Sequence, residues 1–132
     1  MKSHGIAAVI KKDNKFLLLK ESRDLLFGLW KPPSGRAEEF DLDEEATVMR
    51  EVKEETDLEV KPIKKLWTTK ADTKVKTVSF WLAEIIGGDL KIDEREASEF
   101  KWATTDEALE LKLYPGTKKF FEKVKAGKIE IL

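Results

Sequence analysis

Three glutamates lie close together in the segment Arg50–Leu58, at Glu51, Glu54 and Glu55. In a helix, which turns about 100° per residue, these side chains fall on one narrow face. Like charges four residues apart, as at Glu51 and Glu55, cost a helix roughly 0.2–0.5 kcal/mol. A hard divalent cation such as Mg²⁺ takes carboxylate oxygens and would reverse that repulsion. The spacing therefore indicates a candidate metal site, with a solvated acidic face as the alternative.

The segment that carries these acids is expected to be a helix, because apolar and small residues recur in it at helical spacing. Asp41 followed by Glu44 has the pattern of a capping box, which would start the helix. The expected apolar stripe, roughly opposite the acidic face, consists of Leu42, Ala46, Met49, Val52 and Thr56. Lys53 falls inside this stripe, so we expect its amine to extend outward to solvent.

This region resembles the signature of the Nudix hydrolases, which reads Gly, five residues, Glu, seven residues, Arg-Glu-apolar, one residue, Glu-Glu, one residue, Gly-apolar. Gly35 opens the motif, and the run Arg50-Glu51-Val52-Lys53-Glu54-Glu55 matches its second half. The chain departs from the pattern in three respects: Asp41 stands in place of Glu, eight residues separate it from Arg50, and Asp57 replaces the closing Gly. Asp tolerates the left-handed backbone that ends a helix better than most residues do.

The resemblance implies a metal shell made of Glu51, Glu54, Glu55 and the backbone carbonyl of Gly35, holding Mg²⁺ or, as a substitute, Mn²⁺. It also implies that Arg50 orients Glu51 through a charge-assisted hydrogen bond. The reaction would be attack of water on a pyrophosphate linkage, with Glu54 or an acid in a later loop taking the proton.

That later loop is the acidic stretch Asp93–Trp102, which resembles the family's loop before a late strand, where some members keep a glutamate that acts as base or extra ligand. Within this loop, Glu96 is our first candidate for that glutamate, and Glu99, which we also assign to substrate binding, is the second. Trp30, in a Gly-Leu-Trp-x-x-Pro lead-in similar to that of the family, is a further candidate for substrate binding. The alternatives are a solvated loop and a tryptophan in the core.

Composition restricts the class of protein. The chain has 132 residues, no Cys and a formal net charge of −1. A disulfide scaffold, a thiolate zinc site and a Cys nucleophile are excluded, and the balanced charge argues against a general nucleic-acid binder. No apolar run approaches the ~20 residues of a membrane span, and no signal-peptide pattern opens the chain. We therefore expect one cytoplasmic domain over residues 1–132.

The remaining patterns predict the elements that must position the acids. Apolar runs over Gly5–Ile10 and Phe16–Leu19, separated by Asp13-Asn14, predict a hairpin whose strands are covered on both faces. Two further strands are expected, at 58–67, with an interruption at Pro62, and at 75–86. Two helices are expected at 106–113 and 117–125. This order predicts a fold of the α+β or α/β class, an α/β/α sandwich around a central mixed sheet, as in the Nudix fold.

The expected substrate is a nucleoside triphosphate, cleaved to nucleoside monophosphate and pyrophosphate as in MutT-type members. Family subgroups that act on ADP-ribose often carry a Pro beyond the motif, and dinucleoside polyphosphate hydrolases a Tyr, whereas Thr73-Lys74-Val75-Lys76 occupies that region here. ADP-ribose or another nucleotide sugar is the enzymatic alternative. A non-catalytic nucleotide- or RNA-binding module is the alternative of a different class, against which the three retained acids argue. The protein is expected to be a monomer or a homodimer.

Overall fold

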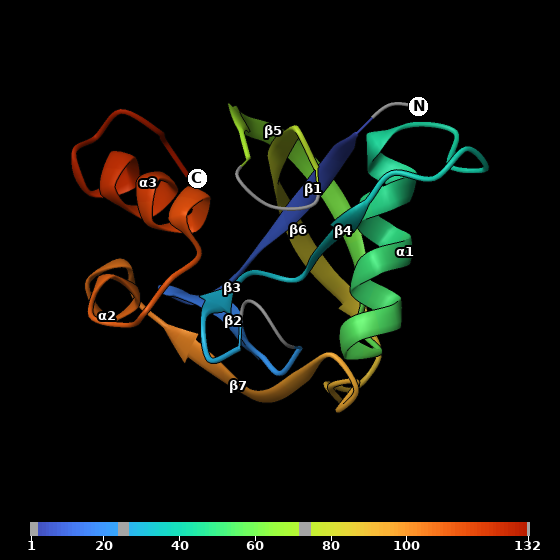
Figure 1. Ribbon diagram of the computed structural model, residues 1–132, viewed down its shortest axis with the longest axis horizontal. Coiled ribbons are helices and arrows are strands. Elements are labelled where there is room, and N and C mark those ends of the chain that lie inside the picture. The colour runs from blue at the N-terminus through green and yellow to red at the C-terminus, as the bar shows by residue number, and fades with distance from the viewer. Residues whose placement is uncertain (1–2, 24–26, 72–74, 132) are drawn as a thin grey trace.

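The computed structural model describes residues 3–23, 27–71 and 75–131 (Figure 1). Its strands are β1 (His4–Lys12), β2 (Lys15–Glu21), β3 (Trp30–Lys31), β4 (Ser34–Arg36), β5 (Glu59–Lys70), β6 (Thr77–Gly87) and β7 (Ala97–Ala103). Its helices are α1 (Glu44–Thr56), α2 (Thr105–Leu109) and α3 (Pro115–Lys125). None of these helices combines the length and apolar character needed to cross a membrane.

The strands form a mixed sheet in which β1 is central. β1 pairs in parallel with β6 and antiparallel with β2 and β4. β5 extends the sheet beyond β6, while β3 and β7 both pair with β2. The predicted hairpin is confirmed as β1 and β2, with Asp13 at its turn in a left-handed conformation (φ 57°).

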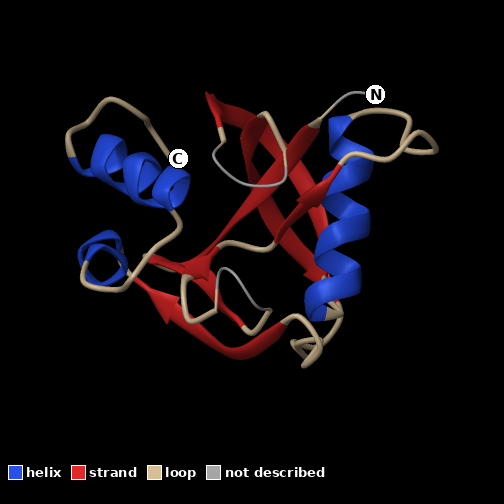
Figure 2. Cartoon of the chain, viewed as in Figure 1, coloured by secondary structure: helices blue, strands red, loops and turns tan. Residues whose placement is uncertain are grey.

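Helices cover both faces of this sheet, with α1 on one side and α2 and α3 on the other (Figures 1 and 2). Successive residues of β1 point to opposite faces, because side chains alternate along a strand. One apolar cluster joins Ile6, Ala8 and Ile10 to Val48 and Val52 of α1. The other joins Ala7 and Val9 to Phe80, Phe120 and Phe121. The predicted α/β/α sandwich with its mixed sheet is therefore confirmed.

Helix α1 begins two residues later than the predicted capping box. Asp43 is the N-cap residue, with an extended backbone and a side chain that accepts a hydrogen bond from the Ala46 amide at 2.8 Å. Asp41 lies outside the helix because its carboxylate is bound by Arg50 instead. At the other end, Asp57 adopts the left-handed conformation (φ 61°) that was expected of it.

The predicted apolar stripe of α1 is wrong in part, because Leu42 and Met49 are exposed. The buried residues of the helix are Thr47, Val48, Val52, Glu55 and Thr56. The hydropathy pattern did not predict this buried face, because it includes the polar residues Thr47 and Glu55. Each of them is buried with a hydrogen-bond partner of its own. Lys53 is exposed, as expected, and its amine forms an ion pair with Asp57 at 3.3 Å.

Two further boundaries differ from those predicted. β5 runs through Pro62 without a break, and the irregularity appears as a shift of register between Pro62 and Lys64. β5 is an edge strand, where a residue without an amide hydrogen is tolerated. α2 ends at Leu109 because the chain that follows pairs with Trp30, whose amide donates to the Lys112 carbonyl at 2.8 Å.

Candidate active site

The candidate site forms where α1 faces β4. Gly35 lies in β4 and is paired with Ile6 of β1, and this register fixes the position of the Gly35 backbone along β1. The same backbone lies directly against the Glu51 side chain, so that a β-carbon added at Gly35 would overlap the Glu51 carboxylate. The absence of a side chain at Gly35 thus brings its backbone next to the first acid of the motif.

Gly35→Ala is therefore expected to push Glu51 out of its place. We expect hydrolysis to fall by roughly 10–100-fold, a typical effect of misplacing a ligand or its support, while the far-ultraviolet circular dichroism spectrum is retained. Steady-state kinetics with Mg²⁺ would measure this loss. The matched control is Gly87→Ala, because the nearest atoms to a β-carbon added there belong to the flexible side chain of Glu59 and Gly87 lines neither cavity of the site. Full activity of the Gly35 variant would contradict the close approach.

Arg50 connects four acceptors around the site. Its guanidinium binds both carboxylate oxygens of Asp41, at 3.0 and 2.8 Å, and donates to Glu51 at 2.8 Å and to Glu54 at 3.1 Å. It also donates to the Arg36 carbonyl at 3.1 Å. Asp41 thus supplies a buried anchor for Arg50 despite its shorter side chain and the extra residue in the motif. The Arg50 guanidinium keeps the pKa of the Asp41 carboxyl well below its usual range.

The three motif glutamates differ sharply in environment. The side chain of Glu54 is 54% exposed, that of Glu51 is 15% exposed and that of Glu55 is only 2% exposed. Burial, followed by repulsion from Glu55, raises the pKa of Glu51 to about 8, although Arg50 opposes the shift. Burial also raises the pKa of Glu55, although the Lys31 amine opposes that shift. The two buried carboxylates therefore share a site that disfavours two negative charges.

These acids fit a hard divalent cation by their chemistry, since all the available ligands are oxygen atoms. A cation beside Glu51 and Glu55 would relieve the repulsion that raises the pKa of Glu51. Across the described ranges, however, no three acidic or histidine side chains converge in a ready-made ligand cluster. Glu54 instead lies against Arg50, and Glu55 is bound by Lys31.

Lys31 is a nearly buried lysine, with a side chain only 5% exposed. Its amine donates to Oε1 of Glu55 at 3.1 Å, and the Ser34 amide donates to Oε2 of the same carboxylate at 3.2 Å. Glu55 is therefore held from two sides, by the last residue of β3 and the first residue of β4.

A further buried carboxylate, Glu21, is bound by side chains from two other parts of the chain. Arg23 binds both of its oxygens at 2.8 Å, and the Tyr114 hydroxyl donates to it at 2.6 Å. Arg23 then reaches Glu96 at 3.1 Å. Burial alone would raise the pKa of Glu21, but the hydrogen bonds from Arg23 and Tyr114 outweigh that effect and lower it to about 2.

The lowered pKa of Glu21 predicts a loss of stability in acid. Because its pKa is lower in the folded protein, the ionised carboxylate stabilises the fold above its ordinary value of 4.5 and ceases to do so as the pH falls towards about 2. Glu21→Gln should lower the free energy of unfolding at neutral pH by a few kcal/mol and flatten its decline across that window. Urea denaturation between neutral and acid pH measures both effects. Equal pH dependence of the free energy of unfolding in the wild-type and Glu21→Gln proteins would contradict this prediction. The control is Glu99→Gln, because the Glu99 side chain is exposed.

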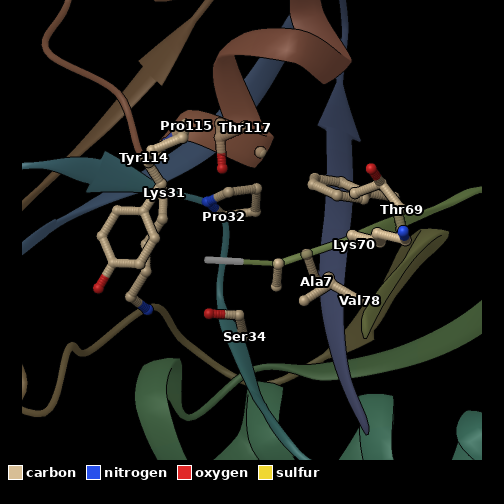
Figure 3. Close-up of a pocket in the computed structure, with 13 residues that line it drawn as sticks. Ala7, Lys31, Pro32, Ser34, Thr69, Lys70, Val78, Tyr114, Pro115 and Thr117 are labelled. Carbon is tan, nitrogen blue, oxygen red and sulfur yellow. The ribbon is translucent and has the colours of Figure 1, made fainter. Parts of the chain in front are cut away.

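Two adjoining cavities open beside these residues. A charged cleft of about 280 Å³ is lined by Arg23, Gly35, Arg36, Glu51 and Glu96 among others. A smaller and more apolar pocket of about 60 Å³ is lined by residues such as Ala7, Pro32, Val78, Phe80 and Thr117. Both are lined by Lys31, Ser34, Val78 and Tyr114, and Figure 3 shows Lys31 and Tyr114 on one side of the apolar pocket with Thr69 and Lys70 on the other.

The structure brings most, but not all, of the predicted site residues together. Arg50, Glu51, Glu54, Glu55 and Gly35 are contiguous, and Glu96 lines the charged cleft. Glu99 instead forms an ion pair with Lys20 at 3.2 Å, and Trp30 is buried in the core cluster of α3. Neither lines the two cavities. Of the residues weighed for substrate choice, Thr73 and Lys74 lie outside the described residues.

Five residues of the site were missed from the sequence: Glu21, Arg23, Lys31, Arg36 and Tyr114. Lys31 offered one signal, since it stands between Trp30 and Pro32 in a segment otherwise poor in charge. The contact between Glu21 and Tyr114 joins residues 93 positions apart, and local periodicity carries no information about such a pair.

Comparison with known proteins supports the expected relationship. The NUDIX domain model matches residues 1–124. A bis(5'-nucleosyl)-tetraphosphatase (asymmetrical) from Rattus norvegicus is 33% identical over 115 residues, which are 82% of this chain and 76% of that protein. An ADP-ribose pyrophosphatase from Methanocaldococcus jannaschii is 35% identical over 101 residues, 73% of this chain and 59% of that protein.

The fold agrees with this relationship. The crystal structure of a MutT protein from Methanosarcina mazei Go1 matches with a TM-score of 0.76 at 25% identity, covering 96% of each chain. The Arg-Glu-x-x-Glu-Glu core of the motif, its helix and the mixed sheet between helices all lie within the region that the family model matches. The chain belongs to the NUDIX domain family, whose members hydrolyse phosphoric anhydride bonds of nucleotide-linked substrates.

Proposed function

We propose that this protein hydrolyses a nucleoside triphosphate to nucleoside monophosphate and pyrophosphate, using Mg²⁺. The observation that carries the proposal is the pair of adjoining cavities. A cleft lined by Arg23, Arg36 and Glu51 suits a triphosphate with its metal, and the apolar pocket beside it suits one nucleobase. Concave sites that combine apolar walls with a few placed polar groups are typical of small-molecule binding. Residues 1–132 would work as a single domain.

Glu51, Glu54, Glu55 and the Gly35 carbonyl would hold the metal ion, with Mn²⁺ as a substitute. When bound, the ion neutralises phosphate charge and lowers the pKa of water. Arg50 keeps the Glu51 and Glu54 carboxylates in place through hydrogen bonds of 2.8 and 3.1 Å. Arg23 and Arg36 face the cleft and are placed to bind phosphate oxygens.

In the reaction, the oxygen of a water molecule attacks phosphorus and the bridging P–O bond breaks. The bonding electrons leave with the pyrophosphate, and the proton of the water passes to a carboxylate. Glu54 is our first choice for this base, because its side chain is exposed and retains access to water. Glu96, which lines the cleft, is the second.

The relatives do not decide the substrate, since one is named a bis(5'-nucleosyl)-tetraphosphatase and another an ADP-ribose pyrophosphatase. The test is incubation of the protein and Mg²⁺ with nucleoside triphosphates, ADP-ribose and diadenosine tetraphosphate, followed by product analysis. We expect monophosphate and pyrophosphate from at least one triphosphate, and none from the Glu51→Gln protein. Turnover confined to the other two substrates would overturn the assignment, and binding without turnover would favour a non-catalytic module.

A further inference from the structure

Lys31 lies at the junction of the two cavities and lines both of them. Its side chain is 5% exposed, and its hydrogen bond to Glu55 at 3.1 Å is its one ion pair within the described part of the chain. The other buried carboxylate nearby, Glu21, is already bound through both oxygens by Arg23 and through one of them by Tyr114. Lys31 therefore depends on Glu55 for its counter-charge.

The proposed metal site makes the same demand on Glu55. A divalent ion beside Glu51 and Glu55 would place positive charge next to the Lys31 amine. Like charges that are close together in a buried site repel each other strongly. A lysine amine is a compact charge on a flexible four-carbon stem, which allows it to exchange one partner for another. The cleft that Lys31 faces is where the proposed function places the anionic phosphates of the substrate.

We propose that Lys31 is an exchangeable counter-ion, which binds Glu55 while the metal site is empty and moves to a substrate phosphate when a divalent ion takes Glu55. The inference rests on the proposed function, and it goes further by assigning a role to a residue outside the Nudix motif. Lys31 thus acts on the metal by competing for Glu55 and on the substrate by direct contact.

This exchange couples the two ligands. Metal binding frees Lys31 for phosphate, and phosphate binding removes the competitor of the metal, so each ligand should raise the affinity for the other by the same factor. Without the Lys31 charge, metal alone should bind more tightly and the coupling should shrink. A lysine that merely supported the fold would not produce opposite changes in these two quantities.

The experiment is calorimetric titration of Mg²⁺ into the wild-type and Lys31→Met proteins at mildly alkaline pH, without nucleotide and with α,β-methylene-ATP. We expect Lys31→Met to bind Mg²⁺ alone at least about 5-fold more tightly, and its coupling to the nucleotide to fall by a similar factor, within the usual range of such couplings. Lys31→Gln, which keeps a hydrogen-bond donor for Glu55, should show the same signs and serves if the methionine variant does not fold. Lys65→Met is the matched control, because Lys65 forms an ion pair at 2.8 Å with Glu44, which lies in α1 as Glu55 does.

Unchanged or weaker binding of Mg²⁺ alone by the folded Lys31 variants, in a wild-type background that binds Mg²⁺ and hydrolyses nucleotide, would overturn this inference and leave the proposed function standing. Failure of the wild-type protein to take up Mg²⁺ under either condition would overturn both.

Discussion

Glu54→Gln is expected to reduce turnover by about 10²–10⁴-fold, the usual contribution of a positioned general base, while leaving the fold intact. The neutral amide can neither accept the proton of the attacking water nor contribute charge to the metal shell. The fold should survive because the Glu54 side chain is 54% exposed and its hydrogen bond to Arg50 lies at the surface. Hydrolysis at saturating Mg²⁺, compared with thermal melting of the same samples, measures the two effects separately.

The matched control is Glu45→Gln, which removes an acid from the first turn of the same helix. It should retain wild-type turnover. Near-normal hydrolysis by Glu54→Gln would reject Glu54 as the base, and Glu96→Gln would then be the informative variant, because Glu96 lines the charged cleft. A smaller loss in Glu96→Gln than in Glu54→Gln is what the present assignment predicts.

Arg50→Met is expected to have the largest effect on stability. The side chains of Arg50 and Asp41 are only 21% and 5% exposed, and removing one partner of such a pair costs roughly 3–5 kcal/mol because the other charge is left buried and unpaired. Turnover should also fall, since Glu51 and Glu54 lose the group that orients them. Urea denaturation and steady-state kinetics on the same preparation measure both losses.

Arg50→Lys should recover little of either property, because one amine cannot reproduce the bidentate contact with Asp41 while also reaching Glu51. The control is Arg95→Met, since Arg95 binds Asp93 through the same two-pronged geometry at 3.0 Å but is exposed. Its removal should leave stability unchanged within error. Equal stability of the Arg50 and Arg95 variants would contradict the role of Asp41 as a buried anchor.

The α/β/α sandwich could be predicted because short stretches of the sequence indicate each of its layers. The continuous apolar runs of β1 and β2 require cover on both faces, and the later helical segments supply part of that cover. The boundaries of α1 were less accessible. Its buried face includes Glu55 and Thr47, whose burial is made possible by Lys31 and Asp41 rather than by hydrophobicity.

The acids of the motif could be identified because their spacing is local, whereas the groups that hold them come from elsewhere in the chain. Lys31 reaches Glu55 from 24 positions away, and Arg23 reaches Glu96 from 73. Such pairs form only when the strands are in register, so that no single window of sequence contains both members. The same reasoning explains Trp30, which was a candidate for substrate binding because of its Gly-Leu-Trp-x-x-Pro lead-in but whose ring packs in the core.

Glu51 and Glu55 are buried next to each other, and we propose that a divalent ion binds between them. Calorimetric titration of Mg²⁺ into the protein with α,β-methylene-ATP tests it most directly, with the double variant Glu51→Gln, Glu55→Gln as the comparison. We expect saturable uptake of Mg²⁺ by the wild-type protein and none by the double variant. Absence of uptake by the wild-type protein, or equal uptake by both folded proteins, would contradict it.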